Sequence, residues 1–151
     1  MATTAAVVQK VSDSEAIVKV SGNTTGAVTI NIATDILAAN QIVYPVGGTP
    51  VANIIGFQWS GDVGATYRID RGGVRVATLL ADNGNFLDFI ELFPAENTNN
   101  TSNITVTIVK TDGTTAVQGE LWIRIRKVSG YASKIETAAY SVYDNLTAVG
   151  S

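Results

Sequence analysis

Regular alternation of apolar and polar side chains constrains this chain most, because it indicates extended strands with one buried face. In residues 103–110 one face carries Ile104, Val106 and Ile108, and the other carries Thr105 and Thr107. Residues 120–128 alternate in the same way, with Leu121, Ile123 and Ile125 predicted to point inward and Trp122, Arg124 and Arg126 outward. Both segments are therefore predicted to be half-buried β-strands.

Further segments are short, rich in β-branched or aromatic residues and bounded by turn residues, namely 15–20, 27–32, 53–59, 66–70, 74–80 and 85–90. Eight strands at this spacing predict an all-β fold, either an antiparallel β-sandwich of jelly-roll type or a small barrel. At most one short helix is expected, at residues 34–40 behind the N-cap candidate Thr34. Residues 133–140 are expected to be extended.

Three turn sequences predict hairpins, because Gly, Asn-Gly and Asp-Gly supply the positive φ angles that tight turns need. They lie at residues 70–73, 82–85 and 111–114. Longer surface loops are expected at residues 44–50 and 94–102, where Pro, Gly, Asn and Thr predominate.

A length of 151 residues and the lack of an internal composition break predict a single domain, residues 1–151. Residues 1–12 are interpreted as an N-terminal arm, and residues 129–151 as a C-terminal extension. Within the arm, residues 3–11 are candidates for adding a strand to a neighbouring subunit. The alternative is that they close the protein's own sheet.

The composition limits the chemistry, because histidine and cysteine are both absent. The chain thus lacks the usual proton-transfer side chain, thiolate metal ligands and disulfides. The net charge is −3 and the ten Lys and Arg residues are scattered, so no nucleic-acid partner is expected. The N-terminus does not have the pattern of a secretory signal, and no apolar run approaches the roughly 20 residues of a transmembrane helix, so no membrane partner is expected either.

Four groups of residues are candidate sites. Oxygen ligands at residues 82–88 resemble a calcium loop, but their spacing favours a polar turn. The acids Asp62, Asp70, Asp88 and Glu91 are better explained as solvated surface than as a glycosidase pair.

Core or subunit packing is the preferred role of the aromatic residues, which are Phe57, Trp59, Tyr67, Phe86, Phe89 and Trp122. The basic cluster of Arg124, Arg126 and Lys127 either contacts an acidic partner or is the solvated face of a strand, and the second explanation is favoured.

In its general sequence character the chain resembles the accessory structural proteins of tailed bacteriophage particles, including those of cyanophages. The resemblance lies in the start Met-Ala-Thr-Thr-Ala-Ala-Val-Val, the segment Phe-Gln-Trp-Ser-Gly at 57–61, the hairpin at 67–73 and the basic segment at 123–127. It implies a decoration or cement subunit, made in the host cytoplasm and located in the virion. The implied partners are the major capsid protein or other virion proteins, with assembly as a homo-oligomer, a trimer being favoured.

The sequence therefore predicts a non-enzymatic protein with no catalytic residues, no cofactor and no metal. The candidate partner-binding residues are Thr3, Thr4, Ala5, Ala6, Val7, Val8, Arg124, Arg126 and Lys127. Two alternatives remain open. One is a receptor- or glycan-binding module of a phage tail or fibre that uses the loops at 44–50 and 94–102. The other, less favoured, is a histidine-free glycosidase or lyase.

Overall fold

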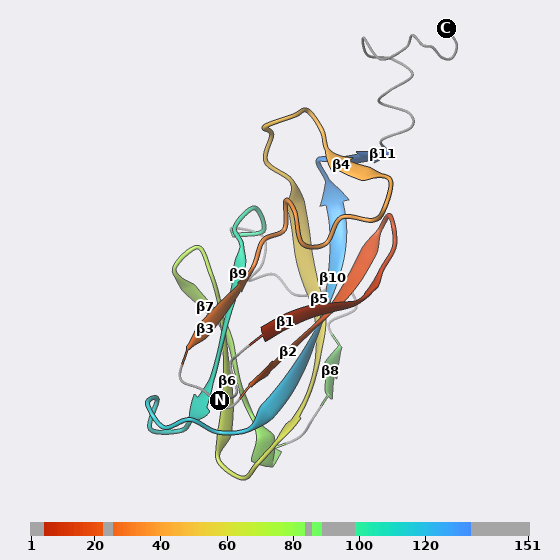
Figure 1. The fold of residues 1–151 in the computed structure, drawn as a ribbon. Helices are drawn as coiled ribbons and strands as arrows, with labels where there is room; N and C mark the ends of the chain where they lie inside the picture. The colour runs from red at the N-terminus through yellow and green to blue at the C-terminus, as the bar shows by residue number, and fades with distance from the viewer. Residues whose placement is uncertain (1–4, 23–25, 84–85, 89–98, 134–151) are drawn as a thin grey trace, which may run out of the picture.

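A computed structural model describes residues 5–22, 26–83, 86–88 and 99–133 and shows an all-β fold (Figure 1). One short 3₁₀ turn, η1 (Ala81–Asn83), interrupts the strands. In chain order the strands are β1 (Ala5–Val11), β2 (Glu15–Gly22), β3 (Ala27–Ile30), β4 (Gln41–Val43), β5 (Val51–Gly61), β6 (Ala65–Arg71), β7 (Val74–Leu80), β8 (Phe86–Asp88), β9 (Ile104–Lys110), β10 (Gly119–Ser129) and β11 (Tyr131–Ser133). The eight strands expected from the sequence are all present.

Eight of the strands pair in a nested order, in which the first of the eight pairs with the last, the second with the seventh, and so on inward. β2 pairs with β10, β3 with β9, β5 with β8 and β6 with β7, all antiparallel. The result is a sheet of order β1-β2-β10-β5-β8 facing a sheet of order β3-β9-β6-β7, and neither sheet closes on itself. This is the jelly-roll arrangement of a β-sandwich, so the barrel alternative is wrong.

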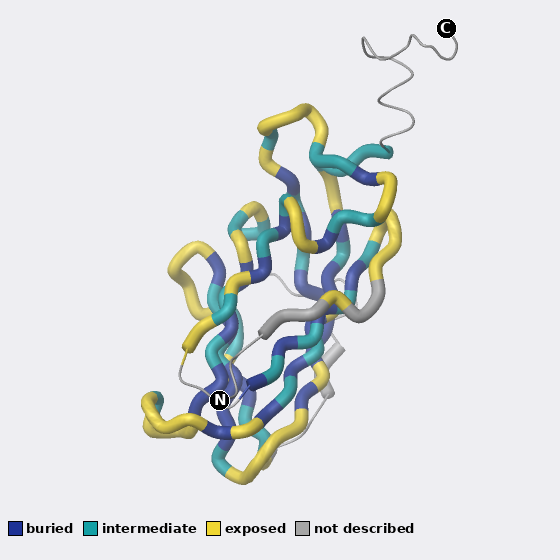
Figure 2. The backbone as a smooth tube through the Cα atoms, in the orientation of Figure 1, coloured by how far each residue is buried: buried dark blue, intermediate teal, exposed yellow. Residues whose placement is uncertain are grey.

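Buried positions occur along the strands of both sheets (Figure 2), and their side chains form the core between the sheets. β2 alternates regularly between half-buried and buried positions, and so does most of β10. The predicted inward residues Leu121, Ile123 and Ile125 of β10 are fully buried, as are Ile104, Val106 and Ile108 of β9. The period-2 pattern therefore identified the buried faces correctly.

Arg71, at the end of β6, is buried to 1 % exposure and ties the sandwich to the segment before β9. Its guanidinium donates to the carbonyl oxygens of Ala52, Asn100 and Ser102 at 2.7–3.0 Å. A buried cation needs such partners, since its desolvation is costly. Arg71 thus fixes the segment around Asn100–Ser102 against β5 and β6.

The hairpin predicted at residues 70–73 is confirmed between β6 and β7. Gly72 and Gly73 have φ angles of 57° and 79°, the left-handed region that favours glycine. The hairpin predicted at residues 82–85 is wrong as a strand connection, because β7 and β8 lie in opposite sheets. The turn at residues 111–114 does close a short hairpin, in which Val109 pairs antiparallel with Ala116, but the following strand β10 lies in the sheet opposite β9. These segments cross from one sheet to the other.

The crossing at residues 111–114 is still a tight turn. Gly113 has a φ of 84° and donates its N–H to the Lys110 carbonyl at 2.8 Å. Asp112 accepts from the Thr115 hydroxyl and from the backbone N–H groups of Thr114 and Thr115 at 2.5–2.8 Å. These hydrogen bonds hold the pKa of the Asp112 carboxyl well below its usual range. The tight turn was thus predicted correctly, but its pairing is short because β9 and β10 belong to different sheets.

The helix predicted at residues 34–40 is wrong, since the segment forms successive turns. Asn31 rather than Thr34 organises its start, accepting from the Ala33 N–H at 2.9 Å through its side chain. The Asp35 carboxylate accepts from the Asn31 N–H at 2.8 Å. Side chains of Asn and Asp that bond nearby backbone groups compete with helix formation, which explains the difference.

The predicted N-terminal arm is partly an element of the domain itself. β1 pairs antiparallel with β2 from Ala5↔Ser21 to Val11↔Ala16, with an irregularity between Val8 and Lys10. The alternative interpretation, in which the segment closes the protein's own sheet, therefore describes residues 5–11. Thr3 and Thr4 lie outside the described residues, as does the predicted C-terminal extension beyond Ser133.

Candidate functional site: the outer face of the five-stranded sheet

The candidate site is the solvent-facing side of the five-stranded sheet, here called the outer face. The outward side chains of β2, β10 and β5 form it, among them Glu15, Ile17, Lys19, Gln58, Ser60, Glu120, Trp122, Arg124 and Arg126. Strand register aligns them in rows, because directly paired residues project to the same side of a sheet. Trp122 lies in the middle strand, between Lys19 of β2 and Gln58 of β5.

Trp122 is half-buried, and the Lys19 ammonium lies 5.4 Å from the centroid of its ring. At this distance the cation is attracted to the ring face. The prediction that Trp122 points outward is confirmed, and its ring lies beside a lysine of β2. Only the pairing of β2 with β10 brings the two residues together.

Glu15 accepts hydrogen bonds from Nε and Nη2 of Arg124, both at 3.1 Å. Nη2 of Arg126 lies 3.6 Å from the other carboxylate oxygen of Glu15. The side chains are 31 %, 47 % and 35 % exposed for Glu15, Arg124 and Arg126, so solvent screens the pairs and each contributes little stability. Their effect is to hold two guanidinium groups side by side on the outer face.

Lys127 does not belong with these arginines, which corrects the predicted basic cluster. Strand alternation turns it to the opposite side of β10, where it is 8 % exposed. Its ammonium donates to the Ser12 carbonyl at 2.8 Å and to Oε1 of Gln41 at 2.5 Å, and it lies 5.5 Å from the ring centroid of Tyr131. Lys127 therefore joins β10 to the β1–β2 turn and to the two-stranded sheet of β4 and β11.

The same junction holds two other polar side chains. Nε2 of Gln41 donates to the Asp13 carbonyl at 2.8 Å, and the Tyr131 hydroxyl donates to the Ile32 carbonyl at 2.7 Å. Burial raises the pKa of Tyr131 to about 12. Burial lowers the pKa of Lys127 to about 8, and the carboxylate of Asp13 partly opposes that change. Gln41 carried no signal in the sequence, because its role depends on long-range packing.

The lowered pKa of Lys127 predicts that the free energy of unfolding rises between pH 7 and pH 9.5. In this range the unfolded chain, with an ordinary lysine pKa of 10.5, binds a proton that the folded protein releases. Urea titrations at the two pH values should show a free energy of unfolding that is roughly 2 kcal/mol higher at pH 9.5 than at pH 7. The Lys127→Met variant should lack this difference. An unchanged pH dependence in the variant would show that another group titrates.

The candidate residues of β1 lie in the same sheet as Arg124 and Arg126. β1 is the edge strand beside β2, and β2 pairs directly with β10. Val8 and Val11 are 36 % and 37 % exposed at this margin. The structure thus brings Ala5, Ala6, Val7 and Val8 into one sheet with the two arginines and separates them from the side chain of Lys127.

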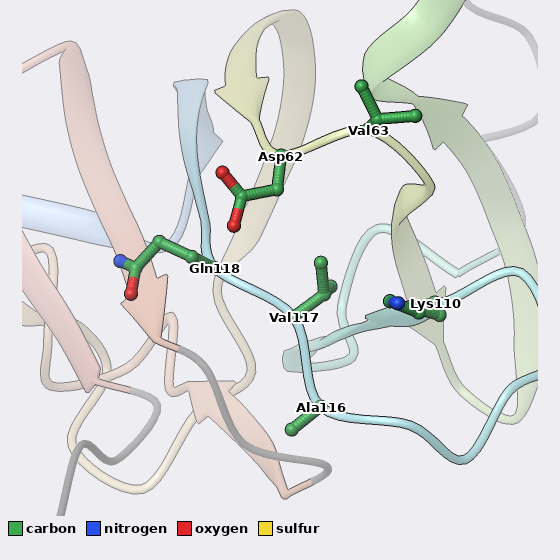
Figure 3. A pocket seen from close by; sticks show the side chains of 6 residues that line it. All are labelled: Asp62, Val63, Lys110, Ala116, Val117 and Gln118. Atoms are coloured by element: carbon green, nitrogen blue, oxygen red, sulfur yellow. The ribbon is translucent and has the colours of Figure 1, made fainter.

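A shallow pocket of about 610 Å³ lies at one end of the sandwich (Figure 3). Asp62 and Val63 of the β5–β6 turn line one side, Lys110 at the end of β9 lines another, and Ala116, Val117 and Gln118 complete it. The Asp62 N–H donates to the Gln118 carbonyl at 3.0 Å, which fixes the turn against this segment. Val63 is 83 % exposed, so the pocket opens widely to solvent.

The acids named as glycosidase candidates do not converge in the described part of the chain. Asp70 pairs with Arg75 at 2.5 Å, and Asp62 lies at the pocket. The side chains of Asp88 and Glu91 lie outside the described residues. Within those described, no group of three or more acidic, cysteine or histidine residues is placed to hold a metal ion.

The aromatic residues divide between the core and the outer face. Phe57, Trp59 and Tyr67 are buried, which confirms the expected core packing. The Trp59 indole N–H donates to the Leu80 carbonyl at 3.0 Å and so links the two sheets. The side chain of Phe86 and the whole of Phe89 are outside the described residues. Of the two tryptophans, Trp122 is therefore the one that a partner can reach.

The described residues form no helix long and apolar enough to cross a membrane. Comparison of the chain with protein-family models, with curated proteins and with solved structures gives no match.

Proposed function

We propose that this chain is a non-enzymatic structural subunit of a phage particle, a decoration or cement protein that binds and stabilises the capsid lattice. The observation that supports the proposal best is the five-stranded sheet. It joins an accessible edge strand, β1, to an outer face bearing Trp122, Arg124 and Arg126. Jelly rolls are common in viral capsids, although the fold alone does not specify a function.

Such a subunit stabilises a shell by mass action, because it binds assembled capsid chains and not dissociated ones. The partner is then the major capsid protein or another virion protein, and the protein, made in the host cytoplasm, ends in the virion. Burial of roughly 800 Å² on each partner is sufficient for a specific contact. Assembly as a symmetric homo-oligomer, a trimer by preference, multiplies weak contacts of this kind.

Quantitative mass spectrometry of purified particles tests the proposal, using the virus whose genome encodes this sequence. We expect the chain in a fixed ratio to the major capsid protein, at hundreds of copies per particle if it covers the lattice. Particles without it should lose their contents at lower temperature. Absence of the chain from purified particles would contradict a structural function, and a few copies per particle would place it at the neck or tail instead.

A second candidate, a receptor- or glycan-binding module of a tail or fibre, is favoured by one observation at the far end of the sandwich. The loop after β4 exposes Tyr44 and Val46 to 52 % and 86 %. An exposed aromatic ring on a loop is a common sugar contact, and lectins also use jelly rolls. If this alternative holds, Tyr44→Ala will abolish binding in a glycan-array measurement while leaving particle incorporation unchanged.

A further inference from the structure

The outer face has a different charge balance from the rest of the molecule. Its described charged side chains are Lys19, Arg124 and Arg126 against Glu15 and Glu120, which leaves one net positive charge. The whole chain carries −3. Both acids of the face already have partners, since Glu15 binds the two arginines and Glu120 accepts from Ser60 and Gln118 at 3.4 and 3.2 Å. The described side chains of the outer face thus carry a net positive charge, whereas the whole chain is acidic.

The cationic groups surround the aromatic side chain at the centre of the sheet. Trp122 lies in β10, which has two strands on either side. Lys19 faces its ring at 5.4 Å, and Arg124 is the next outward residue along the same strand. Tryptophan and arginine are the residues that contribute most to protein–protein binding, above all near the centre of an interface. The half-buried Ile17, paired with Arg124, adds apolar surface beside them.

Glu15 prepares the arginines for a further acidic ligand. One carboxylate shared by two guanidinium groups restricts their conformations while leaving an excess of positive charge. Each guanidinium presents a fork of donors that matches a carboxylate, and less conformational entropy is lost when the fork is held in advance. The arrangement extends over a sheet surface, which suits a protein partner better than a small ligand.

We propose that the outer face docks an acidic surface of a protein partner, with Trp122 as the central contact and Lys19, Arg124 and Arg126 pairing with its carboxylates. This inference rests on the proposed function for the partner's nature, a neighbouring protein of the particle. It adds which face binds and which chemistry the partner presents. Charge complementarity supplies specificity and rapid association more than affinity.

The experiment measures binding of fluorescein-labelled poly-L-glutamate by anisotropy in about 0.1 M salt, where charges are screened beyond about 10 Å. Arg124→Gln combined with Arg126→Gln should weaken binding at least about tenfold. The matched control is Arg68→Gln with Arg75→Gln on the four-stranded sheet, which removes the same charge and should change binding less than about twofold. Binding at the outer face should also change the intrinsic tryptophan fluorescence, and this signal should come from Trp122 because Trp59 is buried. Trp122→Phe should therefore weaken binding and abolish the fluorescence change.

Several outcomes would overturn the docking proposal. Undetectable poly-L-glutamate binding, or equal effects of the two double variants, would show that the outer face has no special affinity for carboxylates. A dT20 oligonucleotide binding at least about tenfold more tightly would indicate a nucleic-acid partner instead. Loss of a homo-oligomer in the Arg124 and Arg126 variant, seen by sedimentation, without a change in poly-L-glutamate binding would assign the face to a second copy.

Failure of this inference and failure of the proposed function are distinguishable. If the chain is present in particles but poly-L-glutamate does not bind, the structural function stands and the docking face is wrong. If poly-L-glutamate binds as expected but the chain is absent from particles, the acidic-partner face stands and the phage function fails.

Discussion

Val106→Asp is expected to destabilise the domain by about 4 kcal/mol or more and to lower its melting temperature by roughly 10 °C or more. Val106 is fully buried at the centre of β9, between Val28 of β3 and Ile69 of β6. A carboxyl group there loses its hydration, and the apolar contacts of the valine are lost as well. Thermal and urea denaturation followed by circular dichroism measure the effect.

The control for this variant is the neighbouring residue of the same strand. Thr107 points to the opposite side and pairs with Arg68, so Thr107→Asp should change stability by less than about 1 kcal/mol. Equal melting temperatures for the two aspartate variants would contradict the assignment of the inner and outer faces of β9.

Gly119→Ala is expected to cost about 3 kcal/mol, because the tyrosine ring of β6 occupies the space that a side chain would need. A Cβ atom at Gly119 would lie 2.6 Å from the Tyr67 hydroxyl oxygen and 3.0 and 3.1 Å from two ring carbons. Tyr67 cannot move easily, since it is fully buried and its hydroxyl donates to the Ser60 carbonyl. Urea denaturation at pH 7 measures the loss.

Tyr67→Phe provides the test of this explanation. Alone it should destabilise the domain by about 1–2 kcal/mol, because the Ser60 carbonyl loses its donor. Combined with Gly119→Ala it should cost at least about 1 kcal/mol less than the sum of the two single variants, since the closest contact is removed. Strict additivity would mean that the alanine is destabilising for a reason other than Tyr67.

Burial also raises the pKa of Tyr67 to about 12, and the charge of Glu120 acts in the same direction. The Tyr67 hydroxyl occupies the space that side chains at Gly61 and Gly119 would need, and these two glycines belong to a row that crosses three strands. Gly22 of β2, Gly119 of β10 and Gly61 of β5 are directly aligned by the strand register. In the sequence these three glycines are far apart and give no sign of acting together.

The candidate site shows the same division between local and long-range information. Alternation within residues 120–128 placed Trp122, Arg124 and Arg126 on one face, and this was correct. The same rule applied to Lys127 would have turned it inward, and grouping it with the arginines by sequence proximity was wrong. Glu15 and Lys19 became part of the site only because β2 pairs with β10. Strand pairing over a separation of about one hundred residues has no local signature.

The turns explain which connections could be predicted. The β6–β7 hairpin was correct because two glycines in the left-handed region determine a tight turn by themselves. The Asp-Gly turn at residues 112–113 formed as expected, yet its flanking strands separate into opposite sheets. A turn sequence specifies the backbone over a few residues, whereas the choice between pairing and crossing depends on which sheet buries the next strand.

By itself the sequence determined the class of fold, the positions of eight strands and the side of β9 and β10 that faces the core. These follow from side-chain alternation and turn residues, which act within a few positions of each other. The nested pairing of the jelly roll, the placement of β1 in its own sheet, the burial of Lys127 and the assembly of the outer face were decided by the tertiary structure. Their physical reason is common to all four, because each depends on burying apolar surface between segments that are distant in the chain.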